Sequence, residues 1–233
     1  MDKLYIVIPA YNEEENIEAV VNQWYPIAEE YGAQMLIIND GSKDRTAAIL
    51  SECEKQRPLL TALNKRNGGH GAAVLYGYHY ALEHHADYIF QTDSDGQTDP
   101  AEFEQFWEER KNYDMNIGNR KHREDGVSRV MVTRVLRAVI KSCFHVSIPD
   151  ANTPYRLMKA DTLRKYIFLI PQDFHLTNVL ISAIFAKKCC KVKYIPITFK
   201  PRQGGVNSMN MKKICKVGVQ SVKEFQKMNR ILQ

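Results

Sequence analysis

The sequence predicts a single α/β domain built on a mostly parallel β-sheet with helices on both faces. Short apolar runs rich in β-branched residues alternate with segments of helical periodicity, which is typical of βαβ units. The chain has 233 residues, 44% of them hydrophobic, and contains no repeat, linker or low-complexity segment. One sizeable core therefore accounts for the whole length.

The first half of the chain alternates regularly. Residues 4–8 form a continuous apolar run that ends at Pro9, as expected of a strand buried on both faces. The same reasoning predicts further strands at 35–38, 59–63 and 88–91. Helices are predicted between them at 13–31, 44–55 and 70–85.

The second half is less regular. We expect helices at 100–111, 126–144 and 173–188, and strands at 115–118 and 192–199, the last with Pro196 on a sheet edge. Residues 146–158 are expected to form two short strands around a turn at 150–154. From Met211 onward, apolar and basic residues fall on opposite faces of a helix, which predicts an amphipathic helix that either lies on anionic lipid or packs on the domain.

Composition indicates a cytoplasmic protein. The five cysteines form no C-x-x-C pair, which favours reduced thiols. The apolar run near the N-terminus is too short for a signal peptide, and no stretch approaches the roughly 18 to 20 apolar residues of a membrane span. The net charge of +5 is compatible with phosphate or anionic-lipid partners, and no nucleic-acid partner is expected. The seven histidines show no metal-ligand spacing.

Polar clusters follow three of the predicted strands: 9–13 (PAYNE), 39–44 (NDGSKD) and 91–97 (QTDSDGQ). Ligands of parallel sheets bind beyond the carboxyl ends of the strands, so the clusters are expected to form one site. Each cluster alone has a structural alternative. Asn12 and Asp44 are both possible helix caps, and the third cluster is possibly just an acidic turn.

Asp93 and Asp95 stand at i and i+2 after an apolar strand. At a turn, two such carboxylates converge on one hard cation, and Mg²⁺ or Mn²⁺ prefers carboxylates together with phosphate oxygens. A metal there would offset the charge of a departing nucleoside diphosphate. A D-x-D pair alone is a weak motif, because it recurs by chance.

The three clusters, together with the glycine-rich stretch 67–73 (NGGHGAA), resemble the family 2 glycosyltransferases in order and spacing. The resemblance runs from about residue 4 to about residue 208. It implies a single-domain, Rossmann-like type-A glycosyltransferase fold over residues 1–208, followed by an amphipathic basic helix over 209–233. It also implies inverting, metal-dependent hexosyl transfer from a UDP- or GDP-sugar.

Four local matches resemble the polyprenyl-phosphate sugar synthases of the dolichol-phosphate mannose synthase type. They are 93–100 (DSDGQTDP), 118–120 (GNR) with Arg129 and Thr133, 150–158 (DANTPYRLM), and 196–205 (PITFKPRQGG) with Ser208. This branch resemblance implies a polyprenyl-phosphate acceptor at the inner membrane face. The amphipathic pattern of residues 211–232 suits peripheral contact with such a membrane, with packing on the domain as the alternative.

The resemblance also implies residue roles. The nucleotide sugar would be bound by Pro9, Ala10, Tyr11, Glu13, Asp40, Gly71, Asp93, Ser94, Asp95, Gln97 and Arg202. The metal ligands would be Asp93, Asp95 and Gln97. The acceptor phosphate would meet Arg120, Arg129 and Thr133, although the stretch 120–134 is alternatively a solvated helix face. Asp95 and Arg202 would be catalytic, with Arg202 on a loop that closes over the diphosphate; guanidinium groups suit phosphate oxygens.

The chain departs from that branch at Thr177, where a carboxylate is usual. A second hypothesis is therefore transfer to a sugar hydroxyl of a cell-surface glycan. A hydroxyl acceptor needs a general base, and Asp173 is the candidate, unless it only caps a helix. Two other classes stay open: a nucleotidyltransferase, which normally has a glycine- and basic-rich loop after the first strand, and a non-catalytic nucleotide-sugar-binding protein.

Overall fold

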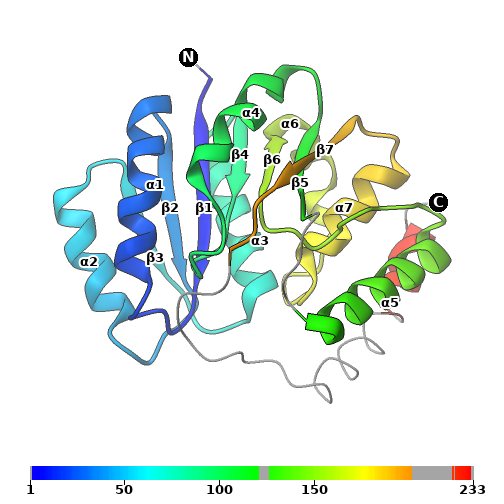
Figure 1. Ribbon diagram of the computed structural model, residues 1–233, viewed down its shortest axis with the longest axis horizontal. Helices are drawn as coiled ribbons and strands as arrows, with labels where there is room; N and C mark the ends of the chain where they lie inside the picture. The colour runs from blue at the N-terminus through cyan, green and yellow to red at the C-terminus, as the bar shows by residue number, and fades with distance from the viewer. Residues whose placement is uncertain (1, 121–125, 201–221, 223, 232–233) are drawn as a thin grey trace.

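A computed structural model describes residues 2–120, 126–200, 222 and 224–231, with the side chains of 126–133 excluded. In this part of the chain, one sheet of seven strands has the order β3-β2-β1-β4-β6-β5-β7 and carries helices on both faces (Figure 1). The strands are β1 (Leu4–Ala10), β2 (Gln34–Asn39), β3 (Leu60–Asn64), β4 (Tyr88–Gln91), β5 (Met115–Arg120), β6 (Arg156–Lys159) and β7 (Val192–Ile197).

The α-helices are α1 (Ile17–Tyr31), α2 (Thr46–Gln56), α3 (His70–Glu83), α4 (Phe103–Glu108), α5 (Gly126–Phe144), α6 (Ala160–Tyr166) and α7 (Thr177–Lys187). Short 3₁₀ turns are η1 (Pro100–Glu102), η2 (Glu109–Lys111) and η3 (Ile167–Leu169). A further helical stretch covers the described residues near the C-terminus, and we call it the C-terminal helix.

The sheet is mostly parallel, as the sequence predicts. β1 to β4 run parallel to one another, and β5 is parallel to β7. β6 is the exception, because it lies antiparallel between β4 and β5. β7 is the last strand in the sheet order, so the predicted edge position of Pro196 is confirmed. Proline has no N–H to donate, which suits an edge.

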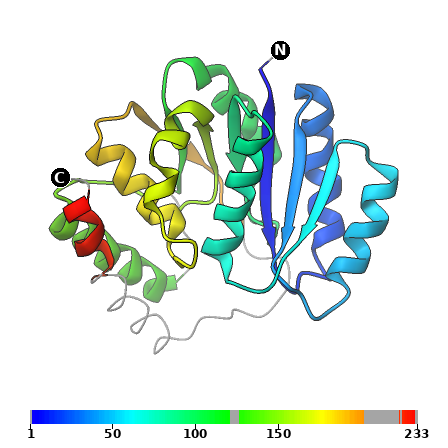
Figure 2. The same cartoon turned by 180° about the vertical axis from the view of Figure 1, so that it is seen from behind.

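Two cores, one on each face, explain the continuous apolar run of β1. Leu4, Ile6 and Ile8 pack with helix α1 and its buried Trp24, whereas Tyr5 and Val7 pack against α3 on the opposite face. Figures 1 and 2 show α1 and α2 on one side of the sheet and α3 on the other. Every residue of β1 is buried, which is the environment that its composition predicts.

Some predicted boundaries are wrong. Helix α1 begins at Ile17 rather than residue 13, because residues 12–16 form a loop in which Asn12 adopts a positive φ of 54°. Helix α7 begins at Thr177 rather than residue 173.

The two short strands expected in 146–158 are also wrong, since only β6 forms between residues 146 and 159, all of which the structure describes. The backbone carbonyls of Ala151 and Thr153 bond to the buried Arg156 guanidinium, so a turn forms before β6 instead of a second strand. Helix α6, which follows β6 directly, was not predicted.

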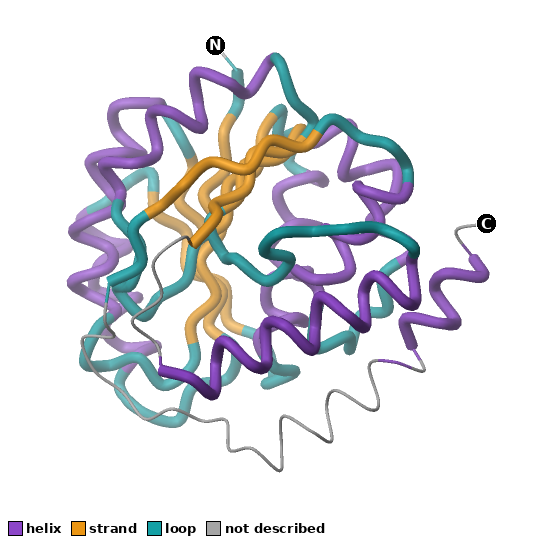
Figure 3. The backbone as a smooth tube through the Cα atoms, turned by 45° about the vertical axis from the view of Figure 1, so that its right-hand side comes forward, coloured by secondary structure: helices purple, strands orange, loops and turns teal. Residues whose placement is uncertain are grey.

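The described part of the C-terminal helix packs on the domain. Phe225 and Met228 are buried, and the Phe225 ring lies 5.4 Å from Phe144 and 5.9 Å from Phe174. Figure 3 shows this helix beside the end of α5. The predicted apolar face is therefore directed into the core here. The rest of the predicted tail lies outside the described residues, and the division at residue 208 stays a prediction.

Among the helices that the structure describes, none is both long enough and apolar enough to cross a membrane.

Candidate active site

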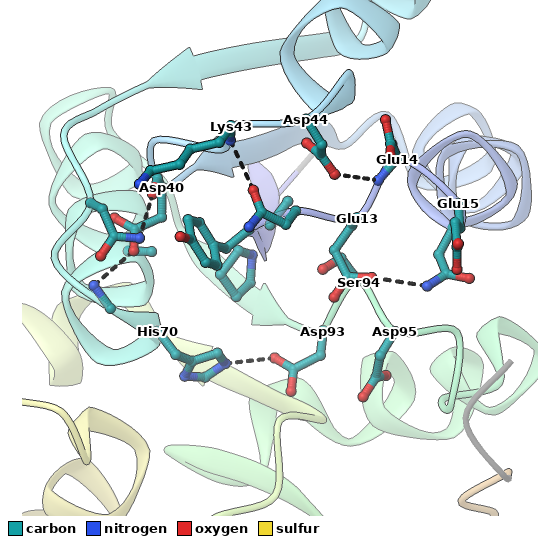
Figure 4. Close-up of a pocket in the computed structure, with 18 residues that line it drawn as sticks. Glu13, Glu14, Glu15, Asp40, Lys43, Asp44, His70, Asp93, Ser94 and Asp95 are labelled. Carbon is teal, nitrogen blue, oxygen red and sulfur yellow. Dashed lines mark hydrogen bonds and ion pairs between the residues drawn. The ribbon is translucent and has the colours of Figure 1, made fainter. Parts of the chain in front are cut away.

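An open pocket of about 900 Å³ lies where β1, β2 and β4 end (Figure 4). Strand order reverses at β1, which has β2 on one side and β4 on the other, and such a switch point leaves a crevice beyond the carboxyl ends. Most of the predicted donor-binding residues line it: Pro9, Ala10, Tyr11, Glu13, Asp40, Asp93, Ser94 and Asp95. The expectation that the three clusters meet in one place is confirmed.

The loops after β1 and β2 are tied together by side-chain-to-backbone hydrogen bonds. The Asn12 N–H donates to Ser42 Oγ (3.0 Å), and the Lys43 N–H donates to Asn12 Oδ1 (2.8 Å). The Glu13 N–H donates to Thr46 Oγ1 (2.9 Å). Asn12 is therefore not the cap of α1 but a link between the two loops, and this link shapes one wall of the pocket.

Asp44 also ties the loop after β1 to the start of α2. Its Oδ1 accepts from the N–H and the hydroxyl of Thr46, and its Oδ2 accepts from the N–H of Glu14. Burial alone would raise the pKa of Asp44, but these hydrogen bonds to the carboxylate outweigh it and hold the pKa below its ordinary value. Asp44 therefore accepts from the first N–H of α2, although the N-cap position of this helix is Arg45, so the predicted cap is displaced by one residue.

Asp40 organises the glycine-rich loop. Its side chain is almost fully buried; Oδ1 accepts from Lys65 Nζ (2.5 Å) and from the Gly68 N–H (2.9 Å), and Oδ2 accepts from the Gly69 N–H (2.7 Å). A carboxylate has about four acceptor positions, so these bonds leave about one on Oδ2. The contact between Asp40 and the nucleoside stays a prediction, and it would have to use this remaining acceptor position of Oδ2.

Two positions of this loop favour glycine, one because of its backbone angle and the other because a neighbouring backbone lies very close. Gly69 has a φ of 87°, which favours glycine. A Cβ on Gly71 would lie 2.1 Å from the carbonyl oxygen of Phe174, so the segment before α7 sits directly on the first turn of α3. Gly71 is buried by this packing and does not line the pocket. Its predicted role in donor binding stays a prediction.

Asp93 and Asp95 extend from the loop after β4, and Figure 4 shows both side chains on one side of it. Asp93 Oδ1 lies 2.9 Å from His70 Nε2, and Asp95 Oδ1 accepts from the Gln97 N–H (3.2 Å). Burial would lower the pKa of His70, but the Asp93 carboxylate outweighs it and raises the pKa above its usual value. Sequence reasoning missed His70, whose place at the first residue of a helix after a glycine-rich loop was an available signal.

The chemistry of this pair fits a divalent cation. Carboxylate oxygens at an open pocket leave room for diphosphate oxygens to complete the coordination of Mg²⁺ or Mn²⁺. In the described residues, no group of three His, Cys, Asp or Glu side chains is placed to hold a metal. Asp93 and Asp95 would therefore need ligands from a bound donor.

Gln97, the third predicted ligand, has a different environment. Its side chain is buried, lies outside the pocket lining, and donates from Nε2 to the Lys200 carbonyl (2.8 Å). The Lys200 N–H donates in return to the Gln97 carbonyl (2.8 Å). Lys200 Nζ also pairs with Asp99 (2.8 Å), and this hydrogen bond lowers the pKa of Asp99. The loop after β4 thus holds the segment that leads to Arg202, which itself lies outside the described residues.

The predicted acceptor residues are only partly described. Arg120 forms a bidentate pair with Asp150 (Nε–Oδ2 2.8 Å, Nη2–Oδ1 2.9 Å), and its guanidinium lies 4.9 Å from the Phe199 ring centre. One edge of the guanidinium is therefore occupied within the fold. The backbones of Arg129 and Thr133 belong to α5, and their side chains lie outside the description.

Asp173, the candidate general base, does not line the pocket, and neither does Thr177, which stands where the branch usually has a carboxylate. Asp173 is exposed and lines a second hollow with Phe168 and Ile231. Thr177 is buried, and its hydroxyl lies 3.0 Å from the carbonyl oxygens of both Gly71 and Phe174. Thr177 joins the starts of α3 and α7, which is a packing role.

Comparison with solved structures places this fold among the type-A glycosyltransferases. The glucosyl-3-phosphoglycerate synthase of Mycobacterium tuberculosis, solved in complex with Mn²⁺, UDP-glucose and phosphoglyceric acid, matches with a TM-score of 0.73. The match covers 98% of this chain and 80% of that one, at 13% sequence identity. A second structure, of a mycobacterial protein, matches with a TM-score of 0.74 at 13% identity.

The model of glycosyl transferase family 2 matches residues 5–167, and the chain belongs to this family. An undecaprenyl-phosphate 4-deoxy-4-formamido-L-arabinose transferase of Pectobacterium carotovorum is 27% identical over 195 residues, covering 80% of this chain and 57% of that protein. The polyprenol monophosphomannose synthase of Mycolicibacterium smegmatis is 25% identical, covering 88% and 80%. The chain spans less than two thirds of the length of the arabinose transferases that it matches.

Proposed function

We propose that this chain is an inverting glycosyltransferase that moves a hexose from a UDP- or GDP-sugar to a polyprenyl phosphate at the inner face of the membrane. The observation that carries the proposal is the Asp93/Asp95 pair at a switch-point pocket in a family 2 chain. The names of the relatives support the acceptor class, since they include transferases to undecaprenyl phosphate and a polyprenol monophosphomannose synthase.

On the donor side, the walls formed by Tyr11, Glu13 and Asp40 would hold the nucleoside. Asp93 and Asp95 would hold Mg²⁺ or Mn²⁺ together with the diphosphate, and the bound metal would supply charge neutralisation for the leaving nucleoside diphosphate. His70 would keep Asp93 oriented through their 2.9 Å contact. Gln97 would act by holding its own loop to Lys200.

On the acceptor side, the nucleophile would be a phosphate oxygen. It is already anionic, so the bond from this oxygen to the anomeric carbon can form as the bond to the diphosphate breaks, with inversion and without a general base. The position of Asp173 outside the pocket is consistent with such chemistry. It favours this acceptor over a sugar hydroxyl with Asp173 as the base.

The deciding experiment offers purified protein Mn²⁺ and a panel of UDP- and GDP-sugars, and measures nucleoside diphosphate release with and without a short-chain polyprenyl phosphate. We expect one donor to show release that the acceptor stimulates. Asp95→Asn should lower kcat at least about a hundredfold, as the loss of an electrostatic stabiliser does in other enzymes. Asp87→Asn, at the opposite end of β4, is the matched control and should keep full activity.

Release that ignores the lipid would redirect the proposal to a glycan acceptor. Nucleotide binding without any turnover would overturn the proposal in favour of a non-catalytic binding protein.

A further inference from the structure

The order of the strands brings the base of a bound nucleotide to Asp40. In the sheet, β1 separates β4, which leads to Asp93 and Asp95, from β2, which leads to Asp40. Two strand spacings are roughly 10 Å, and Figure 4 shows Asp40 and Asp95 on opposite sides of the pocket. With the diphosphate at Asp93 and Asp95, the ribose would cover the end of β1, and the base would reach Asp40.

Asp40 has little acceptor capacity left for that base. Its Oδ1 accepts from Lys65 Nζ and from the Gly68 N–H, and its Oδ2 accepts from the Gly69 N–H. A carboxylate has about four acceptor positions, so about one remains, on Oδ2. Gly69, the partner of Oδ2, lines the pocket with Asp40, whereas Lys65 and Gly68 do not line it. Asp40 can therefore accept one N–H of a base from the pocket side, but not two.

Lys65 and the backbone hold the Asp40 carboxylate in this orientation. The Lys65 side chain is 17% exposed, and its ammonium also donates to the Arg66 carbonyl (2.7 Å). The Asp40 N–H donates to the Ala10 carbonyl (2.9 Å), and the Asp40 carbonyl accepts from Asn67 Nδ2 (2.9 Å). Because both its backbone and its side chain are fixed, Asp40 cannot turn to present both oxygens to a ligand without breaking these bonds.

Nucleobases differ in the number of N–H groups that they offer to a carboxylate. Uracil offers one, N3–H, between two carbonyl oxygens. Guanine offers N1–H beside its N2 amino group, and a carboxylate pairs with such adjacent donors through both oxygens. On Asp40, one of the two guanine donors would be left unpaired, which costs binding free energy in a buried site. Lys43 also lines the pocket, and its ammonium can donate to a carbonyl oxygen of uracil.

We propose that Lys65 and the glycine-rich loop leave Asp40 as the acceptor of a single base N–H, and that this selects a uridine donor over a guanosine donor. The inference rests on the proposed function and deepens it, since that function leaves the base open. Lys65 is a positioning residue in this scheme, because it sets the specificity through Asp40 and does not line the pocket.

The test measures binding of UDP, GDP and CDP to the full chain by titration calorimetry, in excess Mn²⁺ and without acceptor. We expect the parent protein to bind UDP at least about tenfold more tightly than GDP, because one unpaired N–H costs at least that factor. Lys65→Met releases an acceptor position on Oδ1, so it should reduce this preference by about tenfold.

Lys55→Met is the matched control. Lys55 also pairs with a carboxylate, that of Glu52, but both side chains are exposed and neither lines the pocket. The ratio of UDP to GDP affinity should therefore stay at the parent value in this variant.

Asp40→Asn predicts a gain of binding that a folding defect cannot imitate. Lys65 and the Gly68 N–H both donate to Oδ1, so the amide oxygen should take that position and the amide NH₂ should face the base. An N–H donor there opposes the N3–H of uracil and pairs with N3 of cytosine, which is an acceptor. The parent protein should prefer UDP over CDP, and Asp40→Asn should prefer CDP over UDP, each by at least about tenfold.

Equal affinity of the parent protein for UDP and GDP, or a preference for GDP, would overturn the inference and leave the proposed function intact. An Asp40→Asn variant that still prefers UDP over CDP would also overturn it. An unchanged ratio of UDP to GDP affinity in Lys65→Met would remove Lys65 from the scheme. Selective UDP binding without turnover of any UDP-sugar would support the inference and overturn the proposed function, whereas a parent protein that binds none of the three nucleotides would overturn both.

Discussion

The pair formed by Arg120 and Asp150 distinguishes two roles for Arg120. The sequence resemblance implies a contact with the acceptor phosphate, whereas the structure shows two hydrogen bonds to Asp150. Both side chains are nearly buried, at 9% and 5% exposure, and the guanidinium also lies over Phe199. We expect Arg120 to hold the end of β5 to the turn that precedes β6 through this pair.

The perturbation is a double-mutant cycle of Arg120→Ala and Asp150→Ala. Removing one partner of a buried pair leaves a charge without compensation and costs about 3–5 kcal/mol of the free energy of unfolding. Removing both leaves no such charge, so the double variant should lose less than the sum of the singles, by about 2 kcal/mol or more. Urea unfolding followed by the fluorescence of the buried Trp24 measures all four proteins.

Lys193 and Glu109 provide the matched control cycle. They form an ion pair at 2.9 Å with side chains 35% and 32% exposed, so solvent screens the pair and the coupling should be much weaker than that of Arg120 and Asp150. Additive losses for Arg120 and Asp150, or an Arg120→Ala variant of parental stability whose acceptor KM alone rises, would refute the positioning role and restore the acceptor contact.

Three further predictions concern stability. Gly71→Ala should cost about 1–3 kcal/mol, because its Cβ meets the backbone oxygen of Phe174 at 2.1 Å and backbone yields little. Arg156→Met should cost about 1–3 kcal/mol, because the Thr153 carbonyl loses both guanidinium hydrogen bonds in a buried site. Burial lowers the pKa of His79 below its ordinary value, so the unfolded chain binds the proton first and stability falls as pH drops below about 6.5; His79→Gln should flatten this dependence.

Urea denaturation at fixed pH measures the first two, and its repetition between about pH 7.5 and 5.5 measures the third. Gly68→Ala is the control for Gly71, because its Cβ would meet only side-chain atoms, at 3.0 and 3.1 Å, and should cost less. Equal costs at the two glycines would contradict the backbone clash. An Arg156→Met variant as stable as the parent protein would show that the Thr153 carbonyl finds another donor. An unchanged pH profile in His79→Gln would remove that histidine as the source.

The position of the site could be predicted from the sequence. β1 is apolar throughout because it is buried on both faces. Any strand covered by helices on both sides needs such a run, so the run is recognisable in the sequence. The polar residues after β1, β2 and β4 then had to meet, since the carboxyl ends of parallel strands lie at one edge. Asp93 and Asp95 were found in this way, from strand periodicity and local spacing together with the resemblance to family 2.

Other features depend on contacts between residues far apart in the chain, and local patterns carry no record of them. The side-chain amide of Gln97 donates to the Lys200 carbonyl, and the Arg120 guanidinium pairs with Asp150. Gln97 and Arg120 therefore have partners within the fold that their motifs do not predict. His70 meets Asp93 only because α3 begins at the carboxyl edge of β4.

The sequence by itself determined the strand–helix alternation, the mostly parallel sheet and the polar edge, because periodicity records whether a side chain is buried. The tertiary structure alone decided the antiparallel insertion of β6, the contacts of the polar side chains, and the burial of Phe225 rather than its exposure to lipid. The physical reason is that an amphipathic pattern predicts that the apolar face of an element will be buried, while only tertiary packing decides which surface buries it.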